Sequence, residues 1–456
     1  MAEHTVTMES TLEKLLEEKK YATLRDILIT MNPADIAGVF DGMEEQALPL
    51  LFRLLPKEMA AETFVEMDPE AQELLIHGFS DSELHEVLNE LYVDDAVDIV
   101  EEMPANVVRR ILRQADPQMR KEINEILRYP ENSAGSIMTT EYVSLRPKMT
   151  VAEAITRIRR TGVDKETIYT CYVTEERKLL GAVSVKDLLL AADDDTPVSE
   201  IMDENVISVS TLTDQEDVAK MLSKYNFLAL PVVDTDGRMV GIVTFDDAMD
   251  IIEEETTEDI EKMAGMLPSE KTYLRSNAWD LFRHRIPWLA LLMVSATFTG
   301  MIITGFESAL AAQVVLTAFI PMLMDTGGNS GSQASVTIIR ALSLGELDFV
   351  DLPRVVWKEV QTAALCGAAL SLLCFCKIML FDRLLLGNPI TLSVALVVCL
   401  TMAMTVLIAK VVGCTLPLAA KKIGFDPAVM ASPFITTIVD ALSLLVYFGI
   451  ANTLLF

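Results

Sequence analysis

From residue 286 onward, long apolar stretches alternate with short polar connections. A helix that crosses the hydrocarbon core of a membrane needs about 20 predominantly apolar residues. Lipid cannot hydrogen-bond the backbone, so apolar stretches of this length are expected to be helical. Five stretches qualify, at residues 286–306, 308–342, about 360–381, about 390–418 and 427–452. The pattern predicts five transmembrane helices, of which the second is too long for one simple crossing.

The second apolar stretch contains a polar motif. The segment PMLMDTGGNSGSQASVTIIR extends from Pro321 to Arg340 and includes Asp325, Asn329 and Gln333. Because lipid cannot satisfy these side chains, they are expected to face protein, water or a solute. Pro321 and the glycines that follow it predict a broken or bent helix here.

A second polar feature is Asp440, which lies deep inside the last apolar stretch. A carboxylate at mid-span costs several kcal/mol and by default indicates a functional site. The alternative is a structural ion pair with Lys410, the other deeply placed charge. Asp426 directly precedes Pro427, which is ordinary at the start of a helix. Cation contact at the mouth of the span is the alternative for Asp426.

The polar groups of these stretches suit a hard cation. No His or Cys ligand set of the kind that selects zinc, copper or nickel is present, and the six cysteines have neither zinc nor disulfide spacing. Mg²⁺ sheds water reluctantly and is usually held through its waters by a few carboxylates and carbonyls. A wide, glycine-lined site with a single acid, Asp440, is therefore expected to suit hydrated Mg²⁺ rather than a Ca²⁺ cage. Two copies on a two-fold axis would supply two such carboxylates.

The negative charge of the chain is concentrated before the apolar stretches. The net charge is −30, and residues 276–456 contain 10 basic and 10 acidic groups, which leaves 27 basic and 57 acidic groups in residues 1–275. A field of this sign repels nucleic acid and attracts cations, so we expect no nucleic-acid partner. The N-terminal residues lack the basic flank and apolar core of a signal peptide. Basic residues near the span ends predict a cytosolic N-terminus and a C-terminus outside.

The first 130 residues contain a recurring signal for helix starts. Each signal precedes a short amphipathic run, and the signals recur about every dozen residues. Short helices cannot bury one face alone, so we expect them to stack into a superhelical array. The signals are Asn32-Pro33, Glu44, Pro56, Asp68-Pro69, Ser80-Asp81, Asp94, Pro104 and Asp116-Pro117.

Residues 135–255 contain an internal repeat. The segment SIMTTEYVSLRPKMTVAEAITRI aligns with EIMDENVISVSTLTDQEDVAKML; Met138 and Met202 are 64 residues apart, and Gly181 and Gly241 are 60 apart. The alternation of β-rich and helical runs predicts two β-α-β-β-α units. The repeat resembles a tandem of CBS domains. That resemblance implies that Asp187 and Asp247 hold the ribose of ATP or another adenine nucleotide, although many such pairs bind none.

The whole chain resembles the MgtE family of bacterial magnesium channels and transporters, most specifically in PMLMDTGGNSGSQ, GFDPAVMASP and TTIVDALSLLVYF. The resemblance implies a multidomain α-helical membrane protein. An acidic helical array would occupy residues 1–130, α/β tandem CBS domains 131–255, a connecting or plug helix 256–282, and a five-helix pore domain 283–456. It implies a non-enzymatic homodimer in the bacterial plasma membrane that imports Mg²⁺ into the cytosol.

The resemblance also implies which residues meet Mg²⁺. The pore would be lined by Asp440, Thr436, Gly328 and Asn329, with Asp426 near its mouth. Asn226 departs from the acidic residue that some relatives have, which puts one sensor site in doubt. Cytosolic sensor positions would be Asp94, Asp98, Gly135, Asp214, Glu216, Asp247, Asp250, Glu255, Glu258 and Asp259.

Electrostatics independently favours gating by cations. Facing carboxylates repel by about 1 kcal/mol per pair at 4 Å in water. A divalent ion between acidic faces removes this repulsion, so high cytosolic Mg²⁺ is expected to favour a compact, closed state. Most single acids, such as Glu62 and Glu153, are expected to be solvated surface residues.

Two alternatives to an Mg²⁺ pore remain. One is a CBS-regulated carrier of another solute: another divalent cation, an anion or an osmolyte. The other is a non-transporting membrane sensor of Mg²⁺. The sequence leaves open whether the protein is a channel or a carrier, its selectivity over Mn²⁺, Co²⁺, Ni²⁺ and Ca²⁺, and the role of Lys410.

Overall fold

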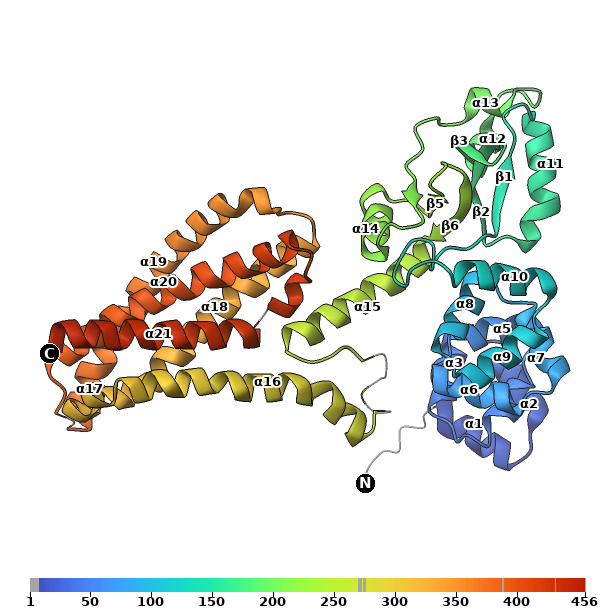
Figure 1. The fold of residues 1–456 in the computed structure, drawn as a ribbon. Coiled ribbons are helices and arrows are strands. Elements are labelled where there is room, and N and C mark those ends of the chain that lie inside the picture. Colours follow the sequence, from blue (N-terminus) through green and yellow to red (C-terminus); the bar gives the residue numbers. More distant parts are fainter. Residues whose placement is uncertain (1–7, 270–272, 274–275, 388, 431, 456) are drawn as a thin grey trace. The chain divides into compact units, whose positions relative to one another are not determined.

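A boundary between Ile252 and Glu253 divides the chain into two folding units (Figure 1). The computed structural model describes residues 8–269, 273, 276–387, 389–430 and 432–455. The first unit contains the helical array and the two repeats, and the second contains the apolar helices. The boundary falls within one long helix, α15 (Phe245–Met263).

Short stacked helices form the N-terminal part of the first unit, as predicted. Local signals start them: the Asn32 side chain accepts a hydrogen bond from the Ala34 amide, and Ser80 and Glu83 form a capping box. Glu44 does not start a helix, because the next one begins at Leu48. The helices are α1 Met8–Glu17, α2 Tyr21–Leu28, α3 Pro33–Asp41, α4 Leu48–Phe52, α5 Lys57–Val65, α6 Pro69–Gly78, α7 Asp81–Leu88, α8 Val93–Glu102, α9 Ala105–Gln114 and α10 Pro117–Ile126.

The two repeats each form the predicted β-α-β-β-α unit. In each repeat the first strand pairs in parallel with the second, and the second pairs antiparallel with the third. The first repeat contains β1 Tyr142–Leu145, α11 Val151–Thr161, β2 Thr167–Glu175, β3 Lys178–Ser184 and α12 Val185–Leu190. The second contains α13 Val198–Ile201, β4 Val209–Ser210, α14 Gln215–Tyr225, β5 Ala229–Val233, β6 Met239–Thr244 and the start of α15.

The repeated Met and Gly residues meet crosswise between the repeats. A Cβ on Gly241 would lie 2.7 Å from the Met138 sulfur, and a Cβ on Gly181 would lie 2.7 Å from the Met202 sulfur. Thr139 bridges Ile242, and Ala182 bridges Asp203, through the backbone. The segment that leads each repeat therefore lies on the last strand of the other, which explains the matched spacings in the sequence.

The linking helix differs from the one expected at residues 256–282. Helix α15 begins earlier, at Phe245, and ends at Met263. Gly265 adopts a left-handed conformation with φ +73°, which terminates a helix in the usual way. A new helix, α16, starts at Ala278 with Asn277 as its N-cap. A left-handed glycine and a fresh cap are incompatible with one continuous helix.

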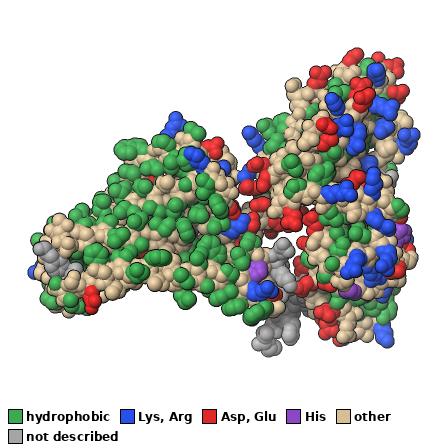
Figure 2. Space-filling model, in the orientation of Figure 1, with side chains coloured by type: hydrophobic (Ala, Val, Ile, Leu, Met, Phe, Trp, Pro, Cys, Tyr) green, Lys and Arg blue, Asp and Glu red, His purple; other side chains and the backbone are tan. Residues whose placement is uncertain are grey.

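Within the described residues of the second unit, four helical segments are long and apolar enough to cross a membrane. Figure 2 shows hydrophobic side chains over the visible face of this unit. A further helix, α18, lies against two of them. The elements are α16 Ala278–Gly305, α17 Glu307–Ala312, a 3-10 helix Val314–Phe319, α18 Ile320–Ser343, a 3-10 helix Phe349–Asp351, α19 Leu352–Cys376 with a π-helical extension Lys377–Leu385, α20 Leu392–Lys422, a 3-10 helix Pro427–Met430 and α21 Ser432–Leu455.

The irregular part of the second apolar stretch is not where the sequence placed it. The chain is interrupted between α17 and α18, before Pro321, and the glycine motif is regular α-helix. Pro321 lies in the first turn of α18, where a proline removes no helical hydrogen bond. The expected break at the motif is therefore wrong.

The glycines of α18 serve close packing instead. A Cβ on Gly413 of α20 would overlap the Gly331 carbonyl, and one on Gly327 would lie 2.6 Å from Thr405 Cγ2. On the α21 side, a Cβ on Gly328 would lie 2.9 Å from Thr436 Cγ2. Small residues let the backbones of membrane helices approach closely. The glycine face of α18 is thus buried between α20 and α21.

Changing Gly413→Leu is expected to force α18 and α20 apart, because the obstacle is backbone and cannot rotate away. We expect a loss of about 1–3 kcal/mol of stability, as for other overpacked cores. The measurement is the thermal unfolding temperature of the full chain in detergent. Gly449→Leu is the matched control, because nothing lies within 4 Å of a Cβ at Gly449. Equal unfolding temperatures for the two variants would contradict this account of the packing.

Candidate functional site

Helix α18 presents a polar stripe on the side away from its glycines. Asp325, Asn329, Gln333 and Thr337 are four residues apart in turn, and all four are exposed in the single chain. Residues spaced by four lie on one face of a helix. The buried glycines therefore fix α18 in place while the stripe remains available to solvent, a solute or a second chain.

Asp440 of α21 lies beside this stripe. It is partly buried and is close enough to Asp325 for the two carboxylates to repel each other. The Asn329 amide donates a hydrogen bond of 3.1 Å to the Asp325 carboxylate. The four positions expected to line a pore, Asp440, Thr436, Gly328 and Asn329, are thus on two helices in contact. The sequence reasoning missed Asp325 as a site residue, although it stands one helical turn before Asn329 in the same motif.

Lys410 has a different partner from the one considered for it. Its ammonium lies 3.6 Å from the Glu359 carboxylate of α19, and both side chains are largely buried. Lys410 is therefore not the ion-pair partner of Asp440, and that alternative is wrong. Charges inside a membrane are usually paired in this way. The pairing leaves Asp440 with the polar stripe as its surroundings.

An acidic cluster forms in the first unit around helix α8. Asp94, Asp95 and Asp98 of that helix lie near Asp247, at the start of α15. Asp94 and Asp95 also lie near Glu166. Asp94 is buried, and its Oδ1 atom has no hydrogen-bond partner among the described residues. Asp94, Asp98 and Asp247 were expected as sensor residues. Two members of the cluster were missed: Asp95, which directly follows Asp94, and Glu166, which is far from α8 in the sequence.

Burial and mutual repulsion raise the pKa values of this acidic cluster. Burial and then Asp247 raise the pKa of Asp95 to about 7. Burial and then Asp95 raise the pKa of Glu166 to about 8. Burial, opposed in part by hydrogen bonds from Thr244, raises the pKa of Asp247 to about 6. The pKa of Asp94 is also raised, first by burial and then by Asp247. Such a cluster favours any positive charge that reaches it.

Other expected sensor positions have local structural contacts. Gly135 has no room for a side chain, because a Cβ would lie 2.5 Å from the Tyr129 ring. The Asp214 carboxylate caps α14, and Glu216 forms an ion pair of 2.7 Å with Lys220. Asp250 contributes to the repulsion on Asp247. Asn226 ends α14 in a left-handed conformation with φ 54°, which suits Asn.

In the second unit, acids near the end of α15 surround a lysine. The Lys262 ammonium lies 2.6 Å from Glu258 Oε1 and 2.7 Å from Asp426 Oδ2. The other oxygen of Asp426 accepts a 2.8 Å hydrogen bond from the Ala428 amide, so Asp426 is a cap and an ion-pair partner at once. Asp259 accepts a hydrogen bond from Ser343 Oγ at the end of α18. Glu255 lies on the same helix, α15. The sequence reasoning did not single out Lys262.

Across the residues whose placement is described, no three Asp, Glu, His or Cys side chains form a preassembled ligand set for a metal ion. The acids instead occur as pairs and as the cluster around α8. Carboxylate groups that do not close on one point can still hold a cation through its own waters, which is the usual mode for Mg²⁺.

The two residues expected to hold a nucleotide ribose have equivalent positions. Asp187 accepts a 2.6 Å hydrogen bond from Ser184 Oγ, and Asp247 accepts one from Thr244 Oγ1. Each therefore stands in the first turn of the helix that follows the third strand of its repeat. Asp187 is exposed, whereas Asp247 is partly buried among the acids. Of the two, Asp187 is the more accessible to a ligand.

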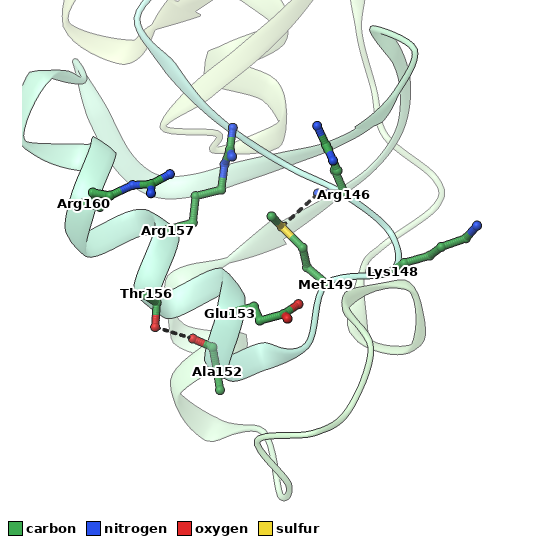
Figure 3. A pocket seen from close by; sticks show the side chains of 8 residues that line it. All are labelled: Arg146, Lys148, Met149, Ala152, Glu153, Thr156, Arg157 and Arg160. Carbon is green, nitrogen blue, oxygen red and sulfur yellow. Dashed lines mark hydrogen bonds between the residues drawn. The ribbon is translucent and has the colours of Figure 1, made fainter.

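A basic hollow of about 570 Å³ lies beside α11 in the first repeat (Figure 3). Its basic lining residues are Arg146, Lys148, Arg157 and Arg160. Arg157 donates a 2.7 Å hydrogen bond to the Ser144 carbonyl, so its guanidinium also supports the local fold. A group of positive charges attracts anions and repels Mg²⁺. The hollow is therefore not a candidate for the cation sites.

Three kinds of known domain match successive parts of the chain. Residues 31–132 match the MgtE intracellular N domain, residues 134–194 and 198–254 match CBS domains, and residues 320–450 match the MgtE divalent cation transporter family. The magnesium transporter MgtE of Thermus thermophilus is 38% identical over 98% of both chains, and that of Bacillus subtilis is 32% identical over 96% of this chain and 95% of its own. The chain belongs to the MgtE family of magnesium transporters.

Solved structures of the cytosolic or soluble parts of magnesium transport proteins are similar to part of this chain. The crystal structure of the cytosolic domain of the Mg²⁺ channel MgtE in complex with ATP is 39% identical, with a TM-score of 0.51 over 54% of this chain and 100% of that chain. The soluble part of a magnesium transporter is 32% identical, with a TM-score of 0.50 over 54% of this chain and 97% of that chain. The predicted fold class, a helical array and CBS pair followed by apolar helices, is confirmed. The full-length MgtE relatives are named transporters, and no catalytic family is indicated.

The acidic cluster should make the first unit less stable as the pH rises. The folded-state pKa values of Asp95 and Glu166 are about 7 and about 8, above the ordinary values near 4. Between pH 4 and these values, the folded state therefore binds more protons than the unfolded state. The contribution of these two groups to the free energy of unfolding is therefore fully present below about pH 4, and it is lost as the pH rises through about 7 to 8. The measurement is amide hydrogen exchange of α8 in the full chain at pH 6 to 9 in chelator, corrected for intrinsic exchange.

Asp94→Asn is expected to reduce that loss by about 1–3 kcal/mol, because it removes one buried carboxylate from the cluster. The control is Glu62→Gln, which neutralises an exposed acid of the same unit. If Asp94→Asn and the unchanged protein lose protection equally with pH, the cluster does not control the stability of α8.

Proposed function

We propose that the chain forms a homodimeric Mg²⁺ channel or transporter that admits Mg²⁺ to the cytosol and is closed by cytosolic Mg²⁺. The observation that carries the conduction part is the pairing of Asp440 with the polar stripe of α18, next to Asp325 and Asn329. Oxygen ligands suit a hard cation, and few carboxylates suit one that keeps its waters. The family match to magnesium transporters supports the same ion.

The position of the polar stripe supports the proposed dimer. Asp325, Asn329 and Gln333 are exposed on a helix that packs among apolar membrane helices, and lipid would leave them without partners. Two copies related by a two-fold axis would place their stripes face to face and enclose a polar path. Each copy would then contribute Asp440, and the two carboxylates would match the charge of one Mg²⁺.

The proposed orientation places the acidic unit in the cytosol of a bacterial cell. Arg283 and Arg285 lie near the start of α16, Arg340 and Lys358 flank the connection from α18 to α19, and Lys421 and Lys422 end α20. Lys and Arg near span ends are retained on the cytosolic side. The C-terminus, at the other end of α21, would then lie outside.

Feedback by Mg²⁺ would act through the acids of both units. In the first unit the cluster around Asp94 and Asp247 holds several carboxylates at close range with raised pKa values. A bound cation would lower the cost of bringing these groups together and so favour the compact state. At low cytosolic Mg²⁺ the repulsion would loosen the assembly. The discrete sensor residues proposed are Asp94, Asp98, Asp247, Asp250 and the acids of α15, including Glu255, Glu258 and Asp259.

An adenine nucleotide is proposed as a second regulatory ligand at the CBS pair. Its support is the ATP complex of the 39% identical cytosolic domain and the exposure of Asp187 at the start of α12. A carboxylate at that place can accept hydrogen bonds from ribose hydroxyls. Asp247, at the equivalent place, is already committed to the acidic cluster, so one nucleotide for each chain is expected.

The two competing functions make different demands on the membrane unit. A carrier of another divalent cation would use the same stripe but select a different ion. A non-transporting sensor would need the acids of the first unit and would give Asp440 no role. Isotope or dye measurements of Mg²⁺, Mn²⁺, Co²⁺, Ni²⁺ and Ca²⁺ entry into liposomes that contain the purified protein separate these cases.

Asp440→Asn is expected to reduce Mg²⁺ flux into liposomes at least about tenfold, because it removes the charge that binds the ion in the pore. Dimer size on gel filtration should not change. Glu346→Gln is the control, since it neutralises an exposed acid outside the spans. Flux at the unchanged level in Asp440→Asn would refute the pore assignment.

Deleting residues 1–130 is expected to leave a conducting protein that closes poorly. The deletion removes Asp94, Asp95 and Asp98, three of the five carboxylates of the acidic cluster, but no part of the stripe. The Mg²⁺ concentration that halves the flux should rise about tenfold, a typical size for coupling between sites. Closure of the shortened chain at the original concentration would show that the array has no part in sensing.

A further inference from the structure

The basic hollow beside α11 has a charge opposite to that of the chain as a whole. The chain has a net charge of −30, yet the lining of this hollow contains four basic residues and one acid, a net charge of +3. Its volume of about 570 Å³ is ample for a small molecule. The basic residues come from the end of β1, the turn that follows it and α11, so they are gathered by the fold of the first repeat.

The protein does not neutralise these positive charges. Within the described part of the first unit, Arg146, Lys148, Arg157 and Arg160 form no ion pair with an acid. The acid of the lining, Glu153, completes a capping box: its carboxylate accepts a 3.1 Å hydrogen bond from the backbone amide at the N-cap of α11. Positive groups held near one another repel, and an anion between them removes that repulsion.

The amides at the start of α11 are already used by the protein. The Ala152 amide donates a 3.0 Å hydrogen bond to the Asp194 carbonyl, and the Glu153 amide donates to Thr150 Oγ1. The loop at residues 193–195 also places three aspartates at this end of the helix. An anion would therefore be held by the arginine side chains and not by the helix N-terminus.

The arginines are arranged to meet one ligand. Figure 3 shows Arg146 and Arg157 extending in the same direction, with Arg160 beside Arg157 and Lys148 pointing away. The Arg157 Nε–H donates a 2.7 Å hydrogen bond to the Ser144 carbonyl, which fixes the direction of its guanidinium. A guanidinium is a planar fork of donors that matches the oxygens of a phosphate group. A side chain that is ordered before the ligand arrives also lowers the entropy cost of binding.

The hollow is separate from the place proposed for the nucleotide. Strand β1 is parallel to β2 and β3 is antiparallel to β2, so β1 and β3 end at opposite edges of the sheet. Arg146 directly follows β1, whereas Asp187 is in the first turn of the helix that follows β3. Asp187 is not part of the lining of the hollow.

We propose that this hollow binds a soluble anion with two or more phosphate groups, held by Arg146, Arg157 and Arg160. A phosphate group carries a charge of about −1.5 to −2 near neutral pH, so two groups offset the +3 of the lining and one does not. The anion binds only the folded hollow and therefore stabilises the first repeat by mass action. The acidic first unit thus has a site for phosphate compounds besides its sites for cations.

The test is isothermal titration calorimetry of the full chain in detergent, with pyrophosphate as the probe. The buffer is free of Mg²⁺, because pyrophosphate itself binds Mg²⁺. The parent should bind pyrophosphate saturably, and Arg146→Gln combined with Arg160→Gln should weaken the binding at least about tenfold. Both side chains are exposed, so the unfolding temperature without pyrophosphate should be unchanged. Amide hydrogen exchange of α11 should slow in the parent when pyrophosphate is added, which locates the ligand.

A matched control separates the hollow from the general charge of the unit. Arg159→Gln combined with Lys178→Gln removes the same charge from two exposed positions of the first repeat that do not line the hollow. This variant should bind pyrophosphate within about twofold of the parent, since salt screens distant surface charges. Asp187→Asn should also stay within about twofold, because it changes only the place proposed for the nucleotide.

Three results would overturn the proposal. The first is a parent that does not bind pyrophosphate saturably, and the second is a control variant that weakens binding as much as the arginine pair. The third is loss of binding in Asp187→Asn, which would place pyrophosphate at the nucleotide site. A soluble ligand is also excluded if α11 exchanges more slowly in phosphatidylglycerol bilayers than in phosphatidylcholine bilayers while pyrophosphate has no effect, because the arginines would then meet a lipid headgroup.

Discussion

The close contact of α18 with α20 and α21 is the constraint on which the membrane unit depends. Gly331 and Gly413 bring two helix backbones together where any larger residue would meet a carbonyl group. With one face of α18 fixed in this way, the opposite face is free to present Asp325, Asn329 and Gln333 beside Asp440. A helix that carries so many polar groups can stay in a membrane only if its neighbours or a water-filled path satisfy them. The buried glycines therefore hold α18 in the position in which its polar stripe lies beside Asp440.

Much of this arrangement could be predicted from the sequence. Apolar length predicted the membrane helices, and cap residues such as Ser80 predicted helix starts because both signals are local. The matched spacing of Gly181 and Gly241 predicted the repeat, although not that each glycine meets a methionine of the other repeat. Partners distant in the sequence could not be predicted from it: Glu359 for Lys410, Glu166 for Asp95, and Lys262 for Asp426. The glycine motif was misread as a break, because glycine lowers helix propensity in isolation but favours close packing between membrane helices.

Cations connect the two units in a single physical account. The first unit gathers carboxylates that burial and repulsion keep partly protonated, and the second places two carboxylates around one lysine. Both arrangements are more stable with positive charge than without it. In the proposed function, the membrane unit would admit the same kind of ion beside Asp440. Under that proposal the transported ion would control its own passage, since the groups proposed to sense it are chemically similar to those proposed to admit it.

The most direct test of this account is the current through purified protein in a planar bilayer, with Mg²⁺ varied on one side at a time. The account predicts an Mg²⁺ current that enters from the side of the C-terminus and falls as Mg²⁺ is raised on the side of the acidic unit. Raising Mg²⁺ on the opposite side should increase the current instead. The account is contradicted if no Mg²⁺ current is carried under any gradient, or if Mg²⁺ suppresses the current equally from both sides.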